Sequence, residues 1–120
     1  MNTKKNNNLI FNLNDIEKRI FKDRWVRFAF GPQGFKQSKK LNFGIVNFEK
    51  NNISLNHSHH VEEALYVLSG NCKIKIAERT FSIKKDDFVF IPKSTDHKII
   101  TDSHPVRILF IFGGEILINH

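Results

Sequence analysis

The sequence predicts an all-β domain, either a sandwich or a barrel. Short apolar runs recur at roughly 8–12-residue spacing with turn residues between them, which is typical of such folds. Twelve phenylalanines supply large apolar groups for a strand-rich core. A chain of 120 residues suits a single domain, and no internal repeat points to a solenoid or a propeller.

The individual elements follow from local patterns. Residues 1–8 are polar, and we expect them to form a flexible tail. The capping pattern at 14–17, with Ile16 and Ile20 four residues apart, predicts a short N-terminal helix. Strands are expected at 24–30, 41–48, 64–68, 72–76, 80–83, 88–91, 98–101 and 107–112. The last segment, 115–120, is expected to pair at a sheet edge or to hang free.

Composition excludes several classes of function. The net charge is +7, but the lysines are scattered and no zinc-finger or helix-turn-helix spacing occurs, so we expect no nucleic-acid partner. No apolar run reaches the length of a membrane span, and the N-terminus does not resemble a signal peptide. Cys72 is the only cysteine and cannot form an intramolecular disulfide. These features predict a cytoplasmic protein without a membrane partner.

A cluster of histidines and glutamates indicates a metal site. Side chains alternate along a strand, so His57 and His59 are expected on one side, and Glu63 has the same parity. Glu62 would face the other way, unless a bulge reverses the choice. His97 is distant in sequence and must be brought in by the fold. Imidazole nitrogens with a carboxylate oxygen form a donor set that suits a divalent transition metal.

The same residues resemble the two motifs of the cupin family. The first motif is Gly, five residues, His-x-His, three or four residues, Glu, six residues, Gly. It is matched by His57, His59, Glu63 and Gly70, with Asn51 at the first glycine. The second motif is Gly, five residues, Pro-x-Gly-x-x-His, three residues, Asn. It is matched by Pro92 and His97, with Asp86, Ser94 and Thr101 at the remaining positions.

The resemblance implies a cupin jelly-roll β-barrel, a double-stranded β-helix, with a single cupin domain over 9–120 and a barrel core at about 41–112. It implies that His57, His59, Glu63 and His97 bind one divalent transition metal: Fe, Mn, Ni, Zn or Cu. It also implies a small-molecule ligand or substrate and a homodimer.

Two functions remain open at this stage. The first is a metal-dependent enzyme acting on a small, oxygen-rich, chelating substrate, of the dioxygenase, isomerase or lyase/decarboxylase type. The alternative is a non-catalytic cupin that binds or senses a metal or a small molecule. The sequence names no general acid or base. Around the site, we expect Phe88 or Phe90 to line the pocket wall, Tyr66 to face outward, and Cys72 to be a small buried hydrophobe.

Overall fold

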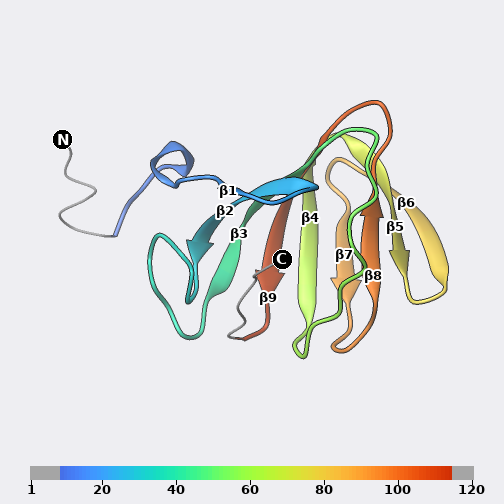
Figure 1. Cartoon of the computed structure of the whole chain (residues 1–120). Coiled ribbons are helices and arrows are strands. Elements are labelled where there is room, and N and C mark those ends of the chain that lie inside the picture. The colour runs from blue at the N-terminus through green and yellow to red at the C-terminus, as the bar shows by residue number, and fades with distance from the viewer. Residues whose placement is uncertain (1–8, 115–120) are drawn as a thin grey trace.

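The computed structural model describes residues 9–114, which form two antiparallel sheets (Figure 1). The larger sheet has the strand order β1-β2-β3-β9-β4-β7, and the smaller one has the order β6-β5-β8. The strands are β1 (Arg19–Ile20), β2 (Arg24–Phe30), β3 (Asn42–Phe48), β4 (Glu63–Ser69), β5 (Asn71–Ile76), β6 (Arg79–Lys84), β7 (Phe88–Ile91), β8 (His97–Ile100) and β9 (Val106–Phe112).

This arrangement confirms the all-β, jelly-roll fold class. Each of the eight expected strands lies within one residue of its predicted bounds. The expectations for 1–8 and 115–120 lie outside the described residues. Within 9–114, no helix has the length and apolarity that a membrane span requires.

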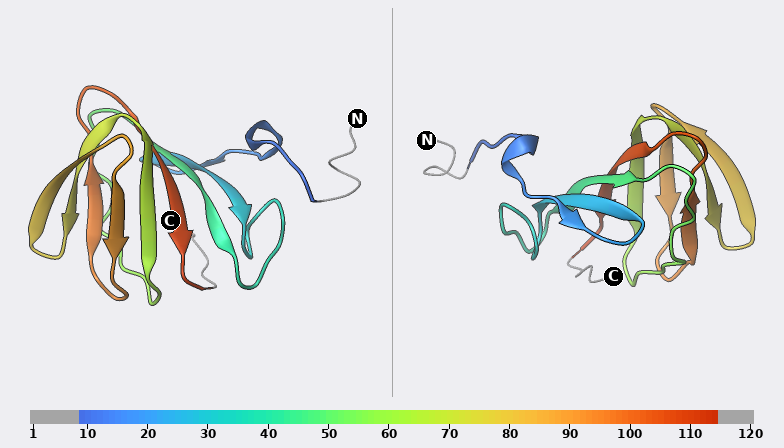
Figure 2. Two further views of the ribbon diagram at one scale, coloured as in Figure 1. Left: turned by 180° about the vertical axis from the view of Figure 1, so that it is seen from behind. Right: turned by 45° about the horizontal axis from the view of Figure 1, so that its top comes forward.

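The N-terminal helix is shorter than expected. It is one 3-10 turn, Leu13–Asp15, and Asn12 rather than Asn14 is its N-cap. The turn lies to the side of the two sheets (Figure 2). The i,i+4 spacing of Ile16 and Ile20 was misleading, because only Ile16 is buried, whereas Ile20 is exposed in β1 opposite Trp25. Pairing with β2 therefore prevails over local helix propensity.

The core lies between the two sheets and follows strand alternation. β9 runs between β3 and β4, and its residues at even positions from Val106 to Phe112 point inward and are buried. The most completely buried side chains are Ile74, Ile91, Ile108, Val67 and Val106. The larger sheet contributes four of these and the smaller sheet one, so the hydrophobic core joins the two layers.

Three departures from the cupin motifs keep the backbone conformation of glycine. Asn51, Asp86 and Ser94 have φ angles of 51°, 75° and 57°, and each stands where the motif has a glycine. Gly70, which the motif retains, has a φ of 84°. A side chain is disfavoured in this left-handed region, most weakly for Asn and Asp. The backbone of the motif is thus preserved although three of its glycines are replaced.

Thr101, at the motif's asparagine position, also has a structural role. Its buried hydroxyl donates to the backbone carbonyl of Glu49 and accepts a hydrogen bond from the backbone N–H of Asn52 at 3.0 Å. These bonds fix the turn before residues 53–57, a segment that runs along β8 through bridges at Ile53 and His57. The turn therefore helps to place His57 beside β8.

Candidate metal centre

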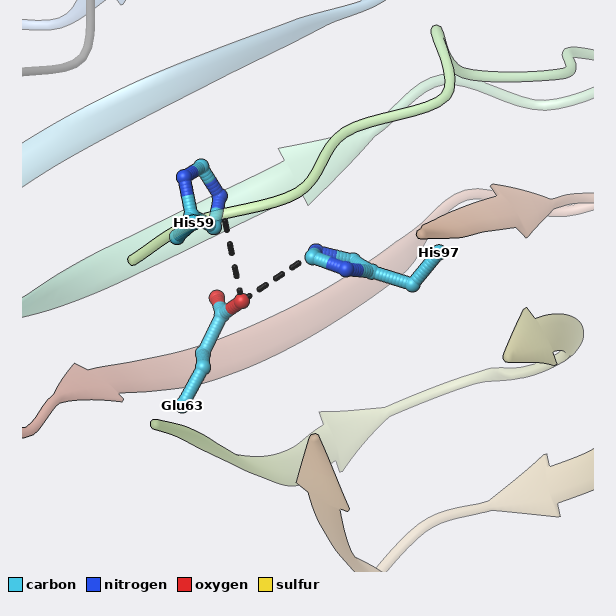
Figure 3. A group of neighbouring side chains, drawn as sticks. All are labelled: His59, Glu63 and His97. Carbon is cyan, nitrogen blue, oxygen red and sulfur yellow. Dashed lines mark ion pairs between the residues drawn. The ribbon is translucent and has the colours of Figure 1, made fainter. Parts of the chain in front are cut away.

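Three of the four predicted ligand residues converge at one end of the space between the sheets. The ligand atoms of His59, Glu63 and His97 all lie within 4.8 Å of one another. Oε1 of Glu63 is 3.2 Å from Nε2 of His97 and 4.0 Å from Nε2 of His59 (Figure 3). Each side chain is only 9% exposed. The cluster is therefore almost completely shielded from water.

Two strand ends position Glu63 and His97. Glu63 is the first residue of β4 and lies opposite Phe112 in β9 and Ile91 in β7, which also point inward. His97 is the first residue of β8, and its backbone forms a pair of hydrogen bonds with His57, at 2.8 and 2.9 Å. The ladders fix both Cα positions, so the side chains meet without local sequence proximity.

His59 reaches the cluster from a loop. Its carbonyl accepts a hydrogen bond from the backbone N–H of Ser94, and its ring packs edge-on against Phe112 at 5.0 Å between centroids. Residues 58–62 are not part of a strand, so the regular alternation we assumed from His57 to Glu63 is absent. The choice of Glu63 over Glu62 nevertheless matches the structure, because Glu63 is buried in the cluster and Glu62 is exposed.

His57 lies beside the cluster rather than within it. Its ring centroid is 6.0 Å from that of His59 and 6.3 Å from that of His97. Its side chain lines the same cavity as the other three, and its Nε2 atom is buried. His57 is not in the group of ligand atoms that lie within 4.8 Å of one another.

The protonation of His97 is set by its neighbours. Nδ1 is 3.0 Å from the backbone carbonyl of Thr95, and a carbonyl only accepts, so Nδ1 carries a proton. In the neutral ring, Nε2 then carries the free lone pair that a metal ligand requires, and this atom faces Glu63. Burial lowers the pKa of His97, while Glu63 and the Thr95 carbonyl raise it, and the net shift is upward. The carboxylate thus attracts a cation at this point.

The donor set fits a divalent transition metal. Oε1 of Glu63 is buried and has no hydrogen-bond partner, and its contact with Nε2 of His97 at 3.2 Å is an ion-pair contact. A buried carboxylate oxygen in this state is unfavourable unless a cation compensates it. Two imidazoles and a carboxylate are ligands that such ions accept, and three protein ligands leave coordination positions for water or substrate.

A cavity opens from the cluster into the space between the sheets. Its volume is about 70 Å³, and it is open to solvent on one side. The lining includes the four predicted ligand residues and a set of apolar side chains: Val26, Phe28, Val46, Phe48, Leu65, Ile99, Phe110 and Phe112. A small molecule entering this cavity would meet the metal-binding atoms at one end.

The prediction that Phe88 or Phe90 lines the wall is wrong. These side chains are 80% and 59% exposed, because alternation along β7 turns Val89 and Ile91 inward instead. The wall aromatics nearest the cluster are Phe110 and Phe112 of β9. The sequence does not reveal these two residues as wall residues, since only the pairing of β9 with β4 places them beside Glu63. Alternation from the buried Ile91 was the available signal against Phe88 and Phe90.

Comparison with known proteins agrees with this architecture. The family model for the cupin domain matches residues 44–112. No curated protein sequence matches the chain. Among solved structures, the DMSP lyase DddQ from Ruegeria pomeroyi DSS-3 superposes with a TM-score of 0.79 at 18% identity, covering 88% of this chain and 60% of the lyase.

Two further structures are similar at comparable levels. The polyketide cyclase RemF from Streptomyces resistomycificus has a TM-score of 0.76 at 17% identity, over 92% of this chain and 87% of the cyclase. The oxalate decarboxylase of Lactobacillus farciminis, as its formate complex, has a TM-score of 0.77 at 24% identity, over 88% of this chain and 33% of that protein. At these identities the likeness establishes the fold, and the chain spans less than two thirds of the lyase and of the decarboxylase.

Proposed function

The chain belongs to the cupin domain family, and from that premise we propose that it is a metal-dependent enzyme. Its substrate is a small, oxygen-rich molecule that chelates the metal, and the reaction is of the dioxygenase, isomerase or lyase/decarboxylase type. The observation that carries this proposal is the buried cluster of His59, Glu63 and His97 at the end of a cavity. The similar structures named as lyase, cyclase and decarboxylase support turnover of small molecules on this fold.

The proposed ligands are His57, His59, Glu63 and His97. His59, Glu63 and His97 lie within 4.8 Å of one another, and His57, which lines the same cavity, completes the set. When bound, a divalent ion supplies a Lewis acid that polarises the oxygens of the substrate. Glu63 provides the negative charge that binds the ion, and Thr95 holds His97 in the required tautomer. Phe112 supports the ring of His59 and helps to exclude water.

A non-catalytic cupin that binds or senses a small molecule is the alternative. It is favoured because, among the described residues that line the cavity, few side chains other than the metal ligands could act as a general acid or base. The hydroxyl of Ser54 is engaged by the backbone of Ile99 and Leu55. Arg24 forms a buried ion pair with Asp23 at 2.7 Å. A general acid or base would therefore have to come from the ligand residues, from bound water or from the substrate itself.

Metal analysis and turnover assays separate these functions. The protein is purified without an affinity tag, analysed for Fe, Mn, Ni, Zn and Cu, and incubated with diketones, hydroxy acids and sugar phosphates. Metal-dependent product formation, lost in Glu63→Gln, supports the enzyme. Tight ligand binding without product supports the alternative. Failure to bind any of these metals would contradict the metal-dependent enzyme.

We also propose that the protein is a cytoplasmic homodimer. Cytoplasmic location is supported by the single thiol, Cys72, which is buried and free. Dimerisation is supported by an uncharged patch that β4, β7 and β9 form on the outer face of the larger sheet. There Phe88 lies opposite Tyr66, and Phe90 opposite Ala64, with Ile111 beyond Ala64. Copies of a chain with net charge +7 repel each other, so an uncharged apolar face is a suitable place for them to meet.

The dimer is tested by adding a charge to this face. Phe90→Lys is expected to convert a dimer into a monomer in sedimentation experiments, because it places like charges opposite each other. The control is Phe81→Lys in β6, which changes a partly exposed phenylalanine of the other sheet. A wild-type protein that is already monomeric, or a dimer unaffected by Phe90→Lys, would contradict the proposal.

A further inference from the structure

The cavity wall next to the metal-binding cluster is apolar. Two residues beyond Glu63 in β4, Leu65 points inward and lies opposite Phe110 of β9. Two residues along a strand correspond to about 7 Å, which is the length of a small ring and its attachment. Phe28 packs against Phe110 in an edge-on contact at 5.9 Å. A molecule bound to the metal would therefore extend directly into an apolar surface.

Glycine at position 44 contributes to this surface. Gly44 of β3 lies opposite Phe110, and a Cβ atom there would be 3.1 Å from Cζ of Phe110 and 2.4 Å from the carbonyl oxygen of Arg27. A side chain at this position would clash with the backbone of β2 and press on the Phe110 ring. The absence of one lets the ring of Phe110 lie close to β3.

The polar groups beyond the cluster are committed elsewhere. The hydroxyl of Ser54 accepts from the N–H of Ile99 at 2.8 Å and donates to the carbonyl of Leu55 at 3.3 Å. Lys98 also borders the cavity, but it alternates with His97 and Ile99, which point inward along β8. The middle of the cavity therefore offers few partners to hydroxyl groups of a ligand.

The distant end of the cavity has a balanced charge. Through Phe48 of β3, Arg24 is level with Val106 at the first end of β9. Glu63 is level with Phe112 at the other end of β9. Six residues of strand correspond to about 20 Å, so Arg24 is well separated from the cluster. Its guanidinium is held by Asp23 at 2.7 Å, and this carboxylate offsets its charge. The distant end does not require an anionic group on the ligand.

We propose that the ligand of this site joins an oxygen-chelating head to an apolar, ring-sized body. The inference rests on the proposed metal-dependent function and narrows its substrate class. The head binds the metal held by His59, Glu63 and His97, and the body packs against Leu65 and Phe110. A sugar-like body would lose the hydration of its hydroxyl groups without gaining partners, and it is therefore rejected.

The test compares two chelators with the same head. Metal-loaded protein is titrated calorimetrically with acetohydroxamate and with benzohydroxamate, and each affinity is divided by the affinity of that chelator for the free metal ion. Burial of the phenyl ring is expected to make benzohydroxamate bind at least tenfold more tightly after this correction, which is about 1.4 kcal/mol. Equal corrected affinities would overturn the inference.

A matched pair of variants locates the effect in the wall. Leu65→Thr is expected to reduce the preference for benzohydroxamate at least threefold while leaving the affinity for acetohydroxamate unchanged. Leu109→Thr makes the same change on the outward face of β9 and is expected to keep the preference. An unchanged preference in folded Leu65→Thr would overturn the placement of the body. If that variant does not fold, the wild-type comparison alone decides.

Metal content is measured in the same samples. Metal bound through the cluster together with equal corrected affinities would leave the proposed function intact and defeat only the apolar body. Failure of the wild-type protein to bind metal would defeat both proposals.

Discussion

Replacement of Glu63 by glutamine is expected to weaken metal binding strongly while nearly preserving the shape of the side chain. Glu63 is the only carboxylate in the cluster found among the described residues. Loss of groups that merely orient metal ligands already costs 10- to 100-fold in affinity, roughly. Loss of the charged ligand itself should therefore weaken binding by more than about 100-fold, or about 2.8 kcal/mol.

The matched control is Glu62→Gln, which removes the same charge from the neighbouring, exposed residue. A unit charge about 10 Å from a divalent ion contributes roughly 0.8 kcal/mol in water, and physiological salt reduces this to roughly a third of that value. Glu62→Gln should thus change the affinity by less than about twofold. The contrast between the two variants isolates coordination from general charge.

The stability of the metal-free variants provides a second check. Oε1 of Glu63 is buried and accepts no hydrogen bond, so a neutral amide removes an unfavourable charge and can still contact His97. We expect Glu63→Gln to keep the metal-free unfolding free energy within about 1 kcal/mol of the wild type. Calorimetric titration with the metal and thermal unfolding give both quantities. Equal losses of affinity in the two variants, or full affinity in Glu63→Gln, would show that Glu63 does not coordinate the metal.

Four other outcomes follow from the structure. His59→Ala should lose nearly all bound metal, whereas His57→Ala should retain a weakened site, because of these two histidines only His59 lies in the cluster. Metal titrations in which His57→Ala loses more metal than His59→Ala would contradict our ligand geometry. Chelators should lower the melting temperature of metal-loaded protein, since the ion binds the folded state alone; an unchanged melting curve of a protein shown to contain metal would contradict this. Burial raises the pKa of Cys72 from 9.0 to about 11. At pH 8 the folded protein should therefore contain about 100-fold less thiolate than the unfolded chain and react about 100-fold more slowly with a thiol reagent. Equal rates for the folded and unfolded protein would mean that the thiol is exposed. Above pH 9 the thiol of the unfolded chain ionises before that of the folded protein, which favours the unfolded state. The unfolding free energy should therefore decrease between pH 9 and about 11. Ser94→Gly should raise the unfolding free energy by about 0.5 kcal/mol by relieving a φ of 57°, and a decrease in denaturant melts would show that the serine side chain is needed.

The strands could be predicted because their signal is local. Alternation of polar and apolar residues gives both the position and the buried face of a strand such as β5, in which Cys72 and Ile74 are buried. The N-terminal segment could not be predicted in this way. Its isoleucines have a helical spacing, but Ile20 pairs with Trp25 in a two-residue strand. That outcome depends on a neighbouring strand and not on the segment itself.

The convergence of three of the four predicted ligand residues could be anticipated from the sequence, but the way in which the fold places them could not. The spacing of the two motifs points to His59, Glu63 and His97, and these three residues converge. Strand parity does not explain the position of His59, since a loop carries it to the cluster. The wall of the cavity depends on which strands are neighbours. Phe110 reaches the site only because β9 lies between β3 and β4.

The central claim is that His59, Glu63 and His97 jointly bind one divalent transition metal, and anomalous diffraction from crystals of tag-free protein tests it most directly. We expect one anomalous peak at about 2.0–2.2 Å from a nitrogen of each histidine and an oxygen of Glu63, as bonded ligands require. A structure of metal-loaded protein whose peak lies instead at exposed histidines such as His60 or His104, with the three clustered side chains bonded only to each other, would contradict it.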